Sequence, residues 1–149
     1  MLNYEEPTTL LANCRKLYED VNSFKEKAFE KDIYEQLNKD ILNLNTLLDN
    51  LLKNPDNTLD ETDENKLFIT NLGGIKLSLN HIKTSINPNF RVKDENNKWL
   101  IMANFFKNPS PPPLQHRQQI GDYLANLAGG LNLLEKFLPT NNSNNQLKR

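Results

Sequence analysis

Apolar residues recur at alternating steps of four and three in four separate stretches, and this spacing limits the fold more than any other feature. Such steps place the apolar side chains on one face of an α-helix. The four series are Leu10, Cys14, Leu17, Val21, Phe24, Ala28; Ile33, Leu37, Ile41, Leu44, Leu48, Leu51; Phe68, Leu72, Ile75, Leu79, Ile82, Ile86; and Ile120, Leu124, Leu127, Leu131, Leu134, Leu138. The sequence therefore predicts an all-α fold, an antiparallel four-helix bundle with shallow crossing angles.

The first two series are not in phase, because Ala28 and Ile33 are five residues apart. Asp32 with Glu35 three residues later resembles a capping box that starts a second helix. We expect a tight turn at residues 30–32 and a helical hairpin. The alternative is one long helix whose buried face shifts at this point.

Prolines and capping residues mark the other expected boundaries. The first helix is expected to begin after Pro7, with Thr8 or Thr9 as its N-cap. The polar, acidic segment 54–66 separates the second and third series, and Thr58 and Glu61 have capping-box spacing, as would a start at Thr62. Proline disfavours helical backbone at the residue before it. We therefore expect the second, third and fourth helices to end at Pro55, Pro88 and Pro139.

Residues 87–113 form an irregular connection between the third and fourth helices. A small hairpin and a short extra helix are both compatible with its pattern, and we favour a helix at 99–103. Four of the six residues in 108–113 are proline, which predicts a stiff, extended segment. The polar residues 140–149 are expected to form a disordered tail after a single domain at 1–139.

Composition excludes several classes of protein. The single cysteine, Cys14, rules out an internal disulfide framework and a cysteine-based zinc site, and its place in the first series predicts a core position. No apolar run is long enough for a transmembrane helix, so we expect no membrane insertion. Glu5 and Glu6 stand where a signal peptide would carry basic residues. We therefore expect a soluble, cytoplasmic protein, or one delivered to a host cell.

Charge is distributed unevenly along the chain. Residues 1–66 hold 8 lysines and arginines against 15 acidic residues, a net charge of −7, whereas residues 67–149 hold 10 against 4, a net charge of +6. Halves of opposite sign favour an internally complementary fold. The basic residues of the second half form no stripe with interleaved aromatics, so nucleic-acid binding is not expected.

Two glycine pairs interrupt the third and fourth series. Gly73 and Gly74 lie in NLGGIKLSL, and Gly129 and Gly130 lie in NLAGGLNLL. A glycine inside a helix costs about 1 kcal/mol relative to alanine, so we expect the fold to gain something from the missing side chains. We expect a close approach of the third and fourth helices or a local kink; the alternative is a notch for a ligand or a partner side chain.

The histidines give little support for catalysis. His81 suggests a histidine phosphotransfer domain, a four-helix bundle with an exposed histidine in mid-helix. In that motif a lysine stands three residues after the histidine, followed by glycine, whereas here Lys83 stands at two and Ser85 at four. No glutamate stands three residues before His81 or His116, so the Glu-x-x-His pairs of a di-iron bundle are absent. We expect surface or boundary histidines, no enzyme, no cofactor and no metal site.

An aromatic block in the connection is the better candidate site. It consists of Trp99, Met102, Phe105 and Phe106. Folded back, these side chains would plug the end of the bundle; exposed, they would form a hot spot for a partner protein. The sequence predicts a non-catalytic protein–protein interaction module, such as an adaptor, a chaperone-like subunit or a bacterial effector. Its regular helices also allow pairing with a second copy.

Overall fold

The chain is mostly helical. The computed structural model describes residues 5–27, 30–53, 63–94, 96–107 and 110–138. Within them, four long helices, one short helix and one two-stranded sheet follow in the order α1 (Glu5–Glu26), α2 (Lys31–Lys53), α4 (Asp63–Ile86), β1 (Arg91–Lys93), β2 (Trp99–Ile101), α5 (Ala103–Lys107), α6 (Leu114–Phe137). The predicted all-α class is correct in outline, and the small sheet is the departure from it.

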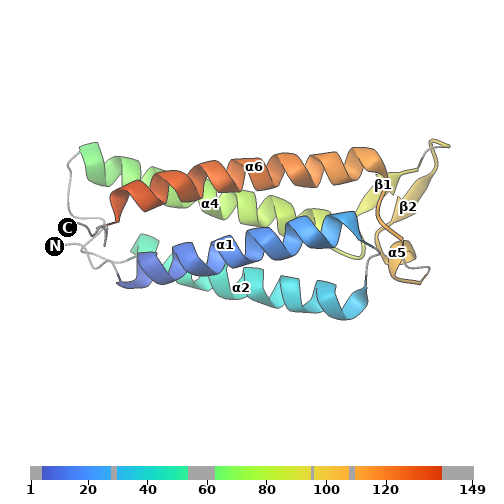
Figure 1. The fold of residues 1–149 in the computed structure, drawn as a ribbon, viewed down its shortest axis with the longest axis horizontal. Coiled ribbons are helices and arrows are strands. Elements are labelled where there is room, and N and C mark those ends of the chain that lie inside the picture. Colours follow the sequence, from blue (N-terminus) through green and yellow to red (C-terminus); the bar gives the residue numbers. More distant parts are fainter. Residues whose placement is uncertain (1–4, 28–29, 54–62, 95, 108–109, 139–149) are drawn as a thin grey trace.

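The four long helices lie side by side along the long axis of the molecule (Figure 1). Helix α1 contacts α2 and α6, and α4 contacts the same two helices. Each long helix therefore packs against two neighbours, and the β1–β2 hairpin and α5 lie together at one end (Figure 1). No described helix is sufficiently long and apolar to span a bilayer.

Side-chain pairs show which parts of neighbouring helices lie next to each other. Arg15 of α1 donates to Glu135 near the end of α6 at 3.0 Å, whereas Glu26 at the end of α1 accepts from Arg117 near the start of α6 at 3.4 Å. Between α2 and α4, the Asn45 amide donates to Asn80 at 3.0 Å.

The core is built from the predicted apolar series. All their members among the described residues are buried except Ile33, whose side chain is 43% exposed. Burial of each large aliphatic side chain contributes about 1.5–3 kcal/mol, so these faces hold the helices together. Ile33 departs because it lies in the first turn of α2, where a hollow opens beside it. Ala28 lies outside the described residues.

The break between the first two series separates two helices, so the alternative of a single continuous helix is wrong. The predicted capping box at Asp32 is also wrong, because α2 begins one residue earlier, at Lys31. The Tyr34 amide instead donates to the Glu30 carbonyl at 3.0 Å. Asp32 still lies in the first turn, where its carboxylate faces the positive end of the helix dipole.

Helix α1 begins at Glu5, earlier than predicted. Pro7 therefore lies inside its first turn, and neither Thr8 nor Thr9 is the N-cap. Proline is tolerated there because first-turn amides have no acceptor within the helix. The predicted caps at Thr58 and Thr62, the prolines at 55 and 139 and the tail 140–149 lie outside the described residues.

The connection between α4 and α6 contains both of the predicted alternatives in succession. Residues 99–101 form a strand, so the helix that we favoured at 99–103 is wrong there, and α5 begins only at Ala103. In the turn, the Asp94 carboxylate accepts from the amides of Asn96 and Lys98, both at 2.9 Å. Asn97 has a φ of 65°, which asparagine adopts more readily than most residues.

Candidate functional site

The β1–β2 hairpin presents one face to solvent. Its register pairs Arg91 with Ile101 and Lys93 with Trp99. Side chains alternate between the faces of a strand, so these four share one face, and all four are exposed. Val92 and Leu100 point to the other face and are buried and half-buried. We call Arg91, Lys93, Trp99 and Ile101 the hairpin face.

Two cations lie against the indole of the hairpin face. The Arg91 guanidinium carbon and the Lys93 ammonium nitrogen are each 4.9 Å from the centre of the Trp99 ring. Trp99 is nevertheless 57% exposed and Ile101 is 40% exposed. Cation–π contacts at exposed sites are worth about 0.5–1 kcal/mol each, so they hold the indole in position without burying it.

The four residues of the predicted aromatic block differ in how far their side chains are exposed. Met102 is fully buried and Phe105 is 9% exposed, so both belong to the plug at the end of the helices. Phe106 is half-buried, and its ring lies 5.7 Å from that of Tyr34 in α2. Only Trp99 is mainly exposed.

A hollow of about 720 Å³ adjoins Trp99 where α4 meets the hairpin. Lys83 and Arg91 bring positive charge to it, and Phe90 shares its wall with the indole. The other lining residues are Asn80, Thr84, Asn87 and Asn89, and none of the described lining residues is acidic. The hairpin end therefore combines positive charge, amides and aromatic surface.

The four glycines also have different surroundings. A Cβ at Gly73, Gly74 or Gly129 would meet no atom within 4 Å, so these three positions are open. A Cβ at Gly130 would lie 2.9 Å from Cγ1 of Ile75 in α4. The Gly130 carbonyl also accepts from the Asn71 amide at 2.9 Å. Only Gly130 makes the close approach between α4 and α6.

His81 is exposed on α4, with its ring 4.8 Å from that of Tyr123 on α6. His116 differs from its predicted surface or boundary place, because it is 5% exposed. Its Nε2 donates to the Ser85 carbonyl at 2.9 Å, and its ring stacks on Phe90 at 5.1 Å. Burial lowers the pKa of His116, against the opposing effect of its hydrogen bonds.

Cys14 lies in the core, where burial raises the pKa of its thiol to about 12. The thiol therefore stays protonated near neutral pH and is a poor nucleophile. Among the described residues, no three histidine, cysteine, aspartate or glutamate side chains are grouped to hold a metal ion.

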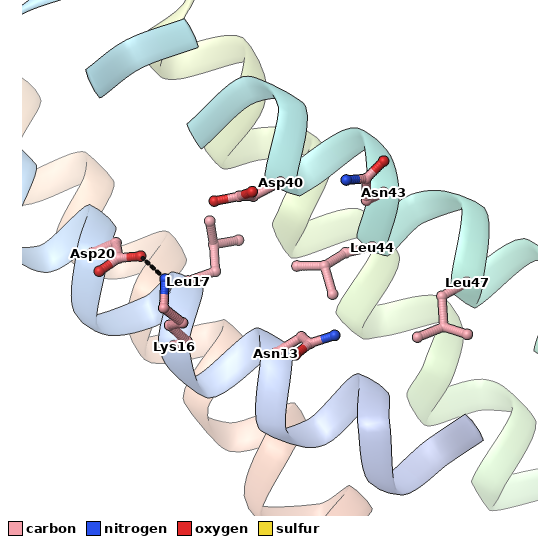
Figure 2. A pocket seen from close by; sticks show the side chains of 8 residues that line it. All are labelled: Asn13, Lys16, Leu17, Asp20, Asp40, Asn43, Leu44 and Leu47. Carbon is pink, nitrogen blue, oxygen red and sulfur yellow. Dashed lines mark hydrogen bonds and ion pairs between the residues drawn. The ribbon is translucent and has the colours of Figure 1, made fainter. Parts of the chain in front are cut away.

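A second hollow, of about 250 Å³, lies between α1 and α2. Leu17 and Leu44 form its floor, and Asp20 and Asp40 stand on opposite sides of it (Figure 2). Sequence reasoning missed this site. The apolar series identified its floor, but its depth depends on how two helices lie against each other, which the pattern of neither helix shows.

The chain matches no protein-family model, no curated protein and no solved structure. Its own residues are therefore the basis for a proposed function.

Proposed function

We propose that this chain is a non-catalytic protein–protein interaction module that binds its partner through the hairpin face. The exposure of Trp99 carries the proposal. Tryptophan and arginine are the residue types most enriched in interface hot spots, and Trp99 and Arg91 lie side by side here. Exposed apolar side chains at Trp99 and Ile101 give a partner surface to bury.

Four helices in an antiparallel bundle are the scaffold that we infer for this face. The contacts of Arg15 with Glu135 and of Glu26 with Arg117 support it, because the contacting residue numbers rise along α1 while they fall along α6. The same relation holds between α4 and α6, where Asn71 bonds Gly130 and Ser85 bonds His116. Such a scaffold would hold the hairpin rigidly at one end.

The partner of the hairpin face should carry carboxylates beside an apolar anchor. Arg91 and Lys93 flank the indole, and Lys83 and Arg91 line the adjoining hollow. Complementary charge would accelerate association and fix its register. An adaptor, a chaperone-like subunit or an effector acting in a host cell would each use such a face, as would a second copy of the chain.

The test compares two substitutions of equally exposed residues. Trp99→Ala removes the centre of the hairpin face, and Leu77→Ala on α4 is its control, since both side chains are 57% exposed. We expect the unaltered protein and the Leu77 variant to capture the same protein from a cell lysate at a fixed stoichiometry, or to form a dimer that light scattering detects. The Trp99 variant should neither capture that protein nor form the dimer. Circular dichroism checks that both variants fold. Retention of the partner by the Trp99 variant would overturn the proposal.

A phosphotransfer module that uses His81 is the second candidate. The exposure of His81 on a long helix favours it, because a phosphodonor can reach the ring. Incubation with acetyl phosphate should then give an acid-labile phosphate that His81→Gln abolishes. No label on the unaltered protein would eliminate this candidate.

A further inference from the structure

The α1–α2 hollow continues along the two helices as a groove. A larger hollow of about 610 Å³ adjoins it and shares three of its lining residues, Lys16, Asp20 and Asp40. Together they extend from Asn13 in α1 to Lys27, which directly follows this helix. Since an α-helix rises 1.5 Å per residue, this groove is roughly 20 Å long, about the length of four helical turns.

The floor of the α1–α2 groove is apolar. Leu17 and Leu44 form it at one end, and Phe24 and Leu37 form it at the other. Two apolar side chains beside this floor reach the surface. Ile33 is 43% exposed, and Leu47 is half-buried. Because the floor side chains are only 2–4% exposed, a partner helix would make its main apolar contacts with Leu47 at one end of the groove and with Ile33 at the other.

The rim of the groove is acidic. Lys16 is paired with Asp20 at 3.4 Å, so these two charges offset each other. Among the described residues, Asp40 accepts only from the Gln36 amide, at 2.9 Å, and has no cation within ion-pair distance. Asp32 and Glu30 add two more carboxylates near the turn, against the single cation of Lys27. The groove is thus apolar at its base and net negative at its edges.

We propose that the α1–α2 groove binds a basic amphipathic helix of about four turns. An amphipathic helix placed in a groove buries its apolar residues at steps of three and four. Its lysines or arginines would then lie against Asp40 and Asp32. This site is separate from the hairpin face and has the opposite charge, so one chain could hold two different partners. The proposal does not depend on the function proposed for Trp99.

The first experiment uses a fluorescein-labelled 14-residue leucine–lysine amphipathic helix, titrated with the full chain and followed by anisotropy. A leucine–glutamate peptide of the same pattern is the control ligand. We expect saturable one-to-one binding of the basic peptide alone, unchanged by Trp99→Ala. Equal binding of both peptides, or none of either, would overturn the proposal.

Charge variants test the place of binding. Asp32→Asn with Asp40→Asn removes two rim carboxylates, whereas Glu19→Gln with Glu35→Gln removes two exposed carboxylates that do not line the groove. Both double variants have the same net charge. We expect about tenfold weaker binding in the first and little change in the second, since a tenfold change corresponds to about 1.4 kcal/mol. Equal weakening would show attraction to overall charge only and would overturn the proposal.

The apolar floor is tested with a second matched pair. The variants are Ile33→Ser and Leu42→Ser. Ile33 lines the groove and Leu42 lies outside it on the same helix, and their side chains are 43% and 44% exposed. We expect weaker peptide binding only in the Ile33 variant. Weaker binding in the Leu42 variant alone would place the peptide elsewhere on α2.

Discussion

Gly130 and its neighbour Gly129 differ only in what lies beside them. A methyl group at Gly130 would overlap the side chain of Ile75, which is fully buried and has little room to move. Overpacking costs about 1–3 kcal/mol, against a helix-propensity gain of about 1 kcal/mol. We expect Gly130→Ala to lower the free energy of unfolding in urea by about 1 kcal/mol, and Gly129→Ala to raise it by about the same amount. Equal stabilisation by both would contradict the close approach.

His116 makes stability depend on pH. Burial lowers its pKa in the folded state, so the unfolded chain takes up a proton first as the pH falls. The contribution of neutral His116 to the free energy of unfolding is therefore complete above a pH of about 6.5, the ordinary pKa of histidine. It is lost as the pH falls from there towards the folded-state pKa. We expect denaturation midpoints to fall more between pH 7.5 and 5.5 in the unaltered protein than in His116→Gln. The exposed His81→Gln control should keep the full dependence.

At the scale of elements, the segment formed by the hairpin and α5 contains both buried side chains that support the fold and exposed side chains. Met102 is fully buried, so Met102→Ala should cost about 2–5 kcal/mol of unfolding free energy. Trp99→Ala should cost only about 1–2 kcal/mol, the value of its two cation–π contacts. Thermal unfolding followed by circular dichroism compares them. A larger loss from the Trp99 variant would mean that the indole supports the fold.

Long elements could be predicted from the sequence and short ones could not. Each apolar series contains six residues, and chance rarely sustains a helical period for so long. Trp99, Leu100 and Ile101 fit a strand or a helix equally well, and it is pairing with β1 that makes them a strand. Of the residues on the proposed hairpin face, the sequence singled out only Trp99, because Arg91 and Lys93 come into contact with the indole only through the pairing of the two strands.

At the scale of the whole molecule, charges of the two halves of the chain meet between helices. Asp49 of α2 accepts from Lys76 of α4, which lowers the pKa of that carboxyl group, and Glu26 pairs with Arg117. Arg15 with Glu135 reverses the signs. All three pairs are at least partly exposed, and exposed ion pairs contribute little to the free energy of unfolding. They favour one alignment of the helices, whereas the apolar series supplies most of the stability.

The antiparallel arrangement that we propose predicts which positions on α1 and α6 can be cross-linked. In a Cys14→Ala background, cysteines replacing Arg15 and Glu135 should be joined by a short bismaleimide, because these side chains meet at 3.0 Å. Cysteines replacing Glu26 and Glu135 should not be joined, since Glu26 instead meets Arg117, which lies 18 residues before Glu135 on α6, roughly 27 Å along the helix. Peptide mass spectrometry after proteolysis identifies each link. A link in the second pair, without one in the first, would require parallel helices and would overturn the scaffold that we propose for the hairpin face.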